Sequence, residues 1–266
     1  MQYLIFMKLS VLFICFLAFG SAYSQKPDLT KLWVGDANNY LKVDSDVVGV
    51  ELFWQYQGKK YASSLGYKYA VIGDTLRIIE QGSNNNTNHD YLIETLTNDK
   101  LKLNSLNTYS RILAFTEIEN KVLTFRSQQN VYTDTINFEK LIFRSTTCYG
   151  MCPAMTFQID NKKKMKFSGD RFAVKQGFYT AVLPGQLYTE LLKVLAISDL
   201  DKLENHGNLN EDLSTYTLEV HYNNKVKFIK SAVLPFVTLQ LRNLLLDLPD
   251  RVTLKKAERM EISFSQ

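Results

Sequence analysis

Residues 148–160 have the sequence Cys-Tyr-Gly-Met-Cys-Pro-Ala-Met-Thr-Phe-Gln-Ile-Asp, and they decide how the second half of the chain folds. After Pro153, apolar side chains at Met155, Phe157 and Ile159 alternate with polar ones. An apolar period of two residues indicates a β-strand with one buried face. The cysteine pair therefore leads into a strand and not into a helix.

The neighbouring segments supply further strands for the same sheet. The Lys162-Lys163-Lys164 run lies at an expected turn, and Asn223-Asn224 joins the last two expected strands. We expect strands, in chain order, at residues 138–143, 155–160, 165–167, 172–182, 215–222 and 226–229.

Two segments have helical spacing instead. The first opens after Pro184-Gly185, and the second begins near Pro235, a favoured first-turn residue, and ends at Pro249. Their expected buried faces are Leu187, Leu191, Val194 and Leu195 in the first, and Val237, Leu241, Leu244, Leu245 and Leu248 in the second. Strands, a helix, a hairpin and a helix predict an α+β domain at residues 136–255, followed by a tail at 256–266.

Residues 25–130 predict a different architecture. Short apolar strands recur about every ten residues, with turns such as Gly73-Asp74 and Asn98-Asp99 between them. This pattern predicts an antiparallel up-and-down sheet, closed into a β-barrel or left as a half-barrel. The polar residues 127–135 mark the expected domain junction.

The first 24 residues have the order of an export signal. An apolar run from Leu9 to Gly20 follows Lys8, and small residues precede a cut before Gln25. The run is shorter than the roughly 20 residues that span a bilayer, so no membrane span is expected after cleavage. Ile14 disfavours a lipid anchor on Cys15. We expect a secreted or periplasmic protein, most readily in a Gram-negative envelope.

Charge and motifs exclude several classes of function. The chain has 31 basic and 27 acidic side chains, a balance that argues against electrostatic capture of nucleic acid. No phosphate-binding loop, His-Glu-x-x-His motif or nucleophile elbow is present. We expect no cofactor, and the sequence favours a protein that is not an enzyme.

Cys148 and Cys152 are the candidate site residues, with three possible roles: a structural disulfide, a redox couple or a metal clip. A redox couple usually has two residues between its cysteines and a helix that stabilises the thiolate, whereas here the spacing is three and a strand follows. The motif also resembles the ligand motif of Sco-type copper chaperones, but those have a thioredoxin-like fold and a distant histidine. The expected export to an oxidising compartment and the three residues between the cysteines favour the structural disulfide.

Other candidates have weaker support. His89, His206 and His221 have no obvious claim as a metal ligand, and His221 has no evident carboxylate partner. The acidic residues from Asp199 to Asp212 lack the spacing of a calcium loop and predict a solvated connector. Trp33, Trp54 and Tyr56 could line a pocket, although such aromatic residues more often form core.

Two parts of the sequence resemble known families. Residues 32–35, 69–76 and 93–101 resemble lipocalin-like domains of secreted bacterial proteins. Residues 141–252 resemble an uncharacterised secreted bacterial domain family with the signature Arg-x-x-x-Cys-aromatic-Gly-x-Cys-Pro, matched from Arg144 to Pro153. This second resemblance implies a location and an architecture but no reaction.

The function expected from the sequence is therefore a non-enzymatic binding or envelope-associated module with a structural Cys148–Cys152 disulfide. Its expected partner is a small apolar ligand or an envelope protein. The alternative is a thiol redox or copper-handling protein that uses the same two cysteines.

Overall fold

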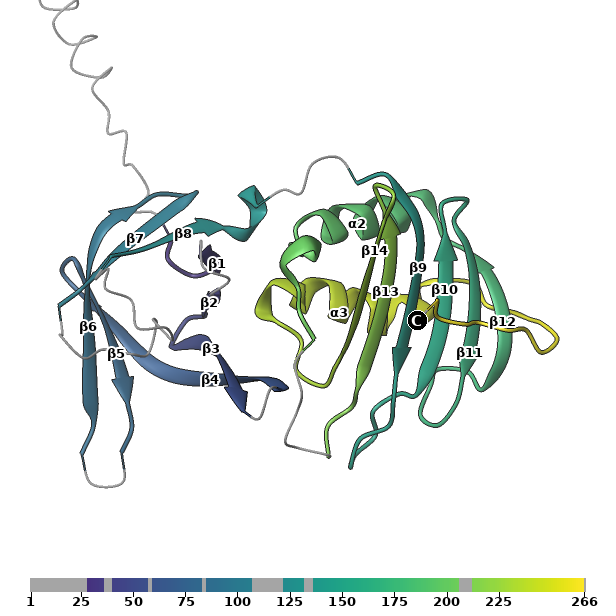
Figure 1. Cartoon of the computed structure of the whole chain (residues 1–266), viewed down its shortest axis with the longest axis horizontal. Coiled ribbons are helices and arrows are strands. Elements are labelled where there is room, and N and C mark those ends of the chain that lie inside the picture. The colour runs from purple at the N-terminus through teal and green to yellow at the C-terminus, as the bar shows by residue number, and fades with distance from the viewer. Residues whose placement is uncertain are drawn as a thin grey trace, which may run out of the picture.

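The computed structural model of the protein describes residues 28–35, 40–56, 59–82, 85–106, 122–131, 136–205 and 212–265, and for residues 52–56 and 59–63 it describes the backbone alone. The expected export signal at residues 1–24, His206, and the side chains of Trp54 and Tyr56 lie outside this description. Two parts follow one another along the chain, as Figure 1 shows.

The first part is a closed antiparallel β-barrel of eight strands in chain order. The strands are β1 (Leu32–Gly35), β2 (Tyr40–Val43), β3 (Val47–Tyr56), β4 (Lys59–Ile72), β5 (Thr75–Glu80), β6 (Thr87–Leu96), β7 (Lys100–Ser105) and β8 (Val122–Ser127). The last strand returns to the first, with Trp33 opposite Ser127 and Gly35 opposite Phe125. This pairing closes the sheet, so the barrel is confirmed and the half-barrel alternative is wrong.

Alternate side chains of the barrel strands form one apolar core. Trp33 is fully buried, and its indole N–H donates to the Leu29 carbonyl oxygen at 2.8 Å. The prediction that Trp33 is part of the core and does not line a pocket is confirmed. The other buried members are Leu29, Leu41, Val43, Val48, Val50, Leu76, Ile78, Tyr91, Leu101, Leu103, Leu123 and Phe125.

The second part is a seven-stranded antiparallel sheet with the order β14-β13-β9-β10-β11-β12-β15. Its strands are β9 (Phe138–Ser145), β10 (Met155–Asp160), β11 (Lys164–Gly169), β12 (Gly177–Val182), β13 (Tyr216–Tyr222), β14 (Lys225–Ser231) and β15 (Lys255–Lys256). Asn223 and Asn224 form the β13–β14 turn, both with positive φ, at 49° and 58°. The expected strand at residues 172–182 is shorter in the structure: Phe172 has a φ of 62°, and pairing with β11 begins at Gly177.

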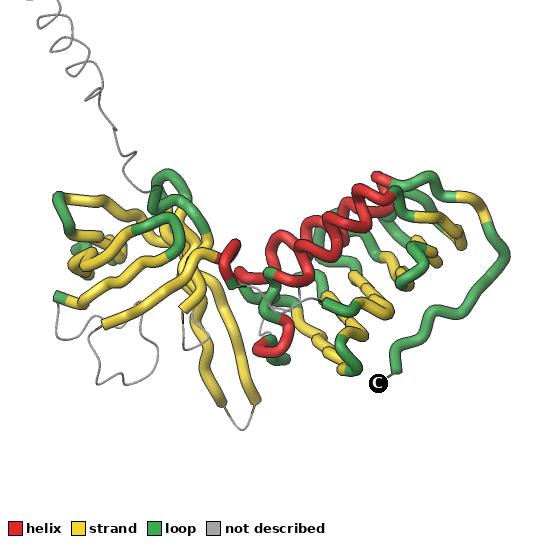
Figure 2. Tube along the Cα trace, turned by 90° about the horizontal axis from the view of Figure 1, so that it is seen from above, coloured by secondary structure: helices red, strands yellow, loops and turns green. Residues whose placement is uncertain are grey.

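Two α-helices, α2 (Gly185–Ala196) and α3 (Leu239–Asp247), cover one face of this sheet. Short 3₁₀ turns stand beside them, at η2 (Leu200–Lys202), η3 (Phe236–Thr238) and η4 (Leu248–Arg251). Every residue predicted for the two buried helix faces is buried. The opposite face, called the open face below, has no helix over it in the described structure. Figure 2 shows the C-terminal segment running past that face.

The two parts are in direct contact. Val34 and Tyr40 of the barrel belong to the core of the second part. Gln128, in the 3₁₀ turn η1 (Gln128–Asn130), is buried and donates to the carbonyl oxygens of Ile197 at 3.1 Å and Val237 at 2.7 Å. The junction is thus a packed interface. In the part of the chain that the structure describes, no helix has the length and apolarity needed to cross a membrane.

Candidate functional site

The cysteine pair lies in the loop that joins β9 to β10, two inner strands of the sheet. The sulfur atoms of Cys148 and Cys152 are 1.99 Å apart, at disulfide distance, and the Cα atoms are 5.4 Å apart. The predicted strand after the pair is confirmed, since β10 begins at Met155. The loop therefore lacks the helix N-terminus that lowers the pKa of a catalytic cysteine.

Hydrogen bonds fasten the base of this loop. The Ser145 hydroxyl donates to the Pro153 carbonyl oxygen at 2.5 Å. This hydrogen bond joins the residues on either side of the cysteine pair. The Thr146 N–H donates to the Thr215 carbonyl oxygen at 3.1 Å, and the Tyr149 N–H donates to that of Asp212 at the same distance. The segment before β13 thus supports the loop along one side.

Two large side chains of the loop project into solvent. Tyr149 is 92% exposed and Met151 is 82% exposed. Most exposed hydrophobic residues elsewhere in the described structure are far less accessible, with values of 36–66%. We call residues 148–152 with these two side chains the contact loop.

Within the described residues, no three His, Cys, Asp or Glu side chains are grouped closely enough to hold a metal ion. His89 Nε2 lies 3.1 Å from Glu80 Oε2. Among these residues, no His, Asp or Glu side chain is therefore grouped with the two cysteines as a third ligand for copper.

The prediction that His221 has no carboxylate partner is wrong. Its Nε2 lies 2.6 Å from Oε1 of Glu219, a fully buried residue on the open face. Burial by itself would raise the pKa of Glu219, but hydrogen bonds from His221 and from the Ser265 N–H outweigh it and leave the pKa below its usual value. The sequence did contain a signal for the first contact, because residues two apart in a strand share a face.

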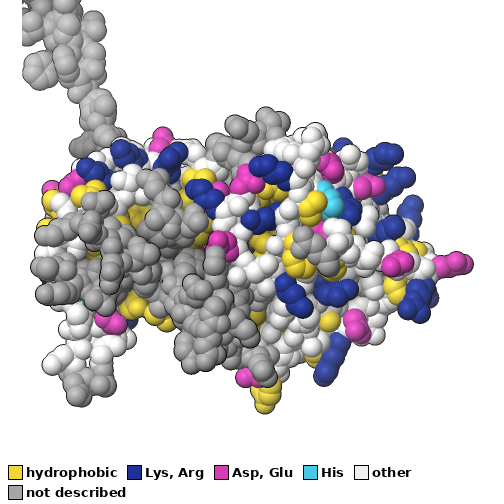
Figure 3. Space-filling view, viewed as in Figure 1, with side chains coloured by type: hydrophobic (Ala, Val, Ile, Leu, Met, Phe, Trp, Pro, Cys, Tyr) yellow, Lys and Arg dark blue, Asp and Glu magenta, His cyan; other side chains and the backbone are white. Residues whose placement is uncertain are grey.

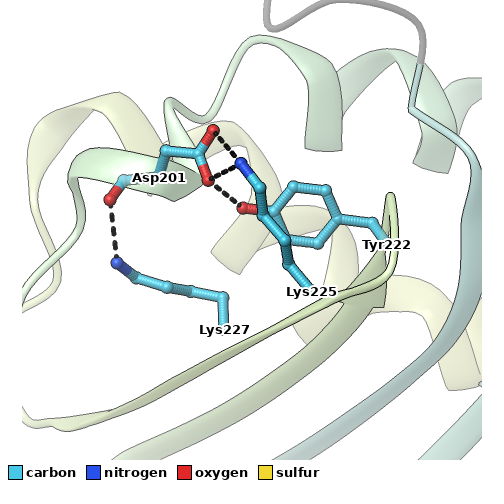
Figure 4. A network of polar contacts seen from close by, with 4 residues as sticks. All are labelled: Asp201, Tyr222, Lys225 and Lys227. Atoms are coloured by element: carbon cyan, nitrogen blue, oxygen red, sulfur yellow. Dashed lines mark hydrogen bonds and ion pairs between the residues drawn. The ribbon is translucent and has the colours of Figure 1, made fainter.

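The acidic connector after α2 was predicted to be solvated, and Asp201 within it is exposed although it is hydrogen-bonded. The Asp201 carboxylate accepts hydrogen bonds from the Tyr222 hydroxyl at 2.8 Å and from Lys225 at 3.3 Å (Figure 4). Its carbonyl oxygen accepts one from Lys227 at 3.0 Å. The Tyr222 hydrogen bond is the main reason that the pKa of Asp201 is lowered. This carboxylate is occupied by neighbouring side chains, and it ties the connector to the β13–β14 hairpin.

The C-terminal segment reaches the open face, and no sequence pattern predicts this position. The Ser265 N–H donates to Glu219 Oε2 at 2.7 Å. The Phe264 ring packs edge-on against Phe228, with centroids 6.0 Å apart, and the Arg144 guanidinium lies 5.2 Å from its centroid. A polar cavity separates the rest of this segment from the sheet.

No curated protein and no solved structure shows significant similarity to the chain. Residues 139–248 match a family described as a domain of unknown function (DUF6438), a range that contains the contact loop and most of the sheet. The chain therefore contains a DUF6438 domain, preceded by an eight-stranded antiparallel β-barrel.

Proposed function

We propose that the protein is a non-enzymatic recognition module, exported to the cell envelope or beyond it, and that it contacts a partner protein through the contact loop. The near-complete exposure of Tyr149 and Met151 on a cross-linked loop is the observation that carries this proposal. A contiguous exposed apolar patch indicates an interaction site, and Tyr149 and Met151 lie two positions apart in one loop. Tyrosine is also among the residues that contribute most energy at protein interfaces.

Preorganisation supports the same conclusion. The bridge and the hydrogen bonds from Ser145, Thr146 and Tyr149 fix the loop before any partner arrives. Binding then orders little additional chain, which reduces the entropic cost of association. We expect the partner to be an envelope protein with an apolar pocket. Export is inferred from the leader expected at residues 1–24 and from the cysteine pair at disulfide distance.

A small apolar ligand in the barrel, which a lipocalin-like domain would bind, has less support. The buried side chains of seven barrel strands pack into one cluster, and a small barrel filled by side chains has no room for a ligand. Thiol redox or copper chemistry is the competing function, but strands flank the two cysteines on both sides.

Site-specific photo-cross-linking tests the proposal. p-Benzoylphenylalanine at position 149 should give a discrete adduct with one envelope protein in the native cell. The matched control carries the same group in place of Val182, which is 66% exposed and lies on β12. Equal adducts from both positions would sink the proposal.

Variants of the cysteines and of Tyr149 distinguish partner recognition from redox or copper chemistry. With Cys148 and Cys152 both replaced by Ser, the adduct at position 149 should weaken but persist. A Tyr149→Ala variant should lose partner binding with its disulfide intact. If the double Ser variant loses all function while Tyr149→Ala retains it, the redox or copper alternative is correct.

A further inference from the structure

Residues 257–265 form what we call the C-terminal arch, because one end is joined to the edge of the sheet and the other end lies on the open face (Figure 2). At the first end, β15 pairs with β12, and the Ala257 N–H donates to the Phe178 carbonyl oxygen at 2.9 Å. At the second end, Ser265 and Phe264 contact Glu219 and Phe228 on β13 and β14. Between these ends, residues 258–263 form no hydrogen bond with the described part of the sheet.

A cavity of about 560 Å³ lies beneath the arch. Its floor is a row of cross-strand neighbours from four adjacent strands, Arg144, Thr156, Ser168 and Phe178. Arg259, Glu261 and Ile262 are among the arch residues that line it. A volume of this size is typical of pockets for small organic molecules.

The charges of the cavity favour an anion. Arg144 and Arg259 both line it, and neither lies within 4.0 Å of a carboxylate among the described residues. The Arg144 Nε donates to the Thr156 hydroxyl at 3.1 Å, and no described acceptor engages its two terminal nitrogens. Glu261 is the single acidic side chain in the lining, so positive charge is in excess. Lys and Arg side chains are also spread over this half of the molecule in Figure 3.

A guanidinium group binds a carboxylate through two parallel hydrogen bonds. The Thr156 and Ser168 hydroxyls lie on the same floor, and Phe178 and Ile262 add apolar surface. We propose that the cavity under the C-terminal arch binds a small organic carboxylate with an apolar chain. Its carboxylate lies between Arg144 and Arg259, and its chain lies against Phe178 and Ile262. This site is distinct from the contact loop and does not depend on the function proposed for it.

Isothermal titration of the purified protein with octanoate tests the proposal, with 1-octanol as the uncharged probe of the same length. Octanoate should bind saturably and at least about tenfold more tightly than 1-octanol, because hydrogen bonds between two charged groups are stronger than those of an uncharged hydroxyl. Arg144→Gln and Arg259→Gln should each weaken octanoate about tenfold or more.

Controls keep a structural effect apart from a lost contact. Arg242→Gln alters a partly buried arginine of α3 outside the cavity and should leave affinity unchanged. Arg259 is exposed and pairs with no described carboxylate, so its variant should keep the wild-type midpoint of thermal unfolding. Tyr149→Ala should bind octanoate normally, which separates this site from the contact loop. Octanoate that does not bind, or that binds equally to the wild type and both arginine variants, overturns the proposal.

Discussion

Cys148 and Cys152 enclose a loop of five residues, and the length of that loop sets what the bridge can contribute. In the chain-entropy model, closing so short a loop stabilises the folded state by about 2 kcal/mol. The bridge therefore acts locally, and the packing of the sheet does not depend on it. Its consequence is to hold Tyr149 and Met151 in one arrangement.

Replacement of both cysteines by Ser should lower the free energy of unfolding by about 2 kcal/mol, because the unfolded chain regains the entropy of the open loop. Urea unfolding of the variant and of the wild type with and without reductant measures the effect. Reduced wild type should match the variant. Complete loss of folding would show that the bridge holds the whole domain together.

Some contacts between individual residues could be predicted from the sequence, and others could not. The cysteine pair and the strand after it follow from local spacing. The Glu219–His221 contact was accessible to the same reasoning, because the two residues share a strand face. The Ser265–Glu219 hydrogen bond joins residues 46 positions apart, and no local pattern encodes such a contact.

Among the elements, helix α2 illustrates how far an apolar pattern determines packing. Its four predicted core residues are the four that the structure buries. Leu191 is fully buried, whereas the adjacent Leu192 is only partly buried against the same core.

Leu191→Ala should destabilise the second part by about 3 kcal/mol, since it removes a buried side chain and leaves a cavity. Leu192→Ala makes the same chemical change on the same helix and should cost clearly less. Thermal unfolding followed by circular dichroism compares the two variants. Equal losses would mean that α2 does not pack as described.

The positions of the strands could be predicted from local patterns. The pairing of distant strands could not. Period-two patterns and turn residues located most strands because both signals lie within a few residues. Closure of the barrel depends on β1 pairing with β8, about 90 residues later in the chain, and turn chemistry contains no information on that contact. The strand expected at residues 172–182 began too early because Phe172 and Val174 are apolar although they lie in a turn.

On the scale of the whole molecule, one acidic side chain lies at the packed junction between the barrel and the second part. Glu51, on β3, is 2% exposed, and its Oε1 accepts the Phe236 N–H at 2.5 Å. Its Oε2 is buried without a hydrogen-bond partner among the described residues. Burial raises the pKa of Glu51 to about 8, and the Phe236 hydrogen bond only partly opposes this increase. The folded protein thus holds a protonated carboxyl group at neutral pH.

The direction of the pH effect follows from this raised pKa. Below about pH 4.5, the usual pKa of a glutamate side chain, the group is protonated in both the folded and the unfolded chain, and folding has no ionisation cost. Between that pH and about 8 the unfolded chain releases the proton while the folded protein retains it. The free energy of unfolding should therefore fall by up to about 1.4 kcal/mol per pH unit over this range.

Glu51→Gln should remove this pH dependence, because a glutamine side chain does not ionise. We expect the variant to gain stability relative to the wild type as the pH rises from 5 to 8. Urea unfolding followed by tryptophan fluorescence measures the difference in the barrel, since Trp33 and Trp54, the two tryptophans of the chain, both lie on barrel strands. Glu139→Gln, at an exposed position of β9, should run parallel to the wild type across the same pH range. Parallel profiles for wild type and Glu51→Gln would mean that the buried carboxyl group does not link the domain junction to pH.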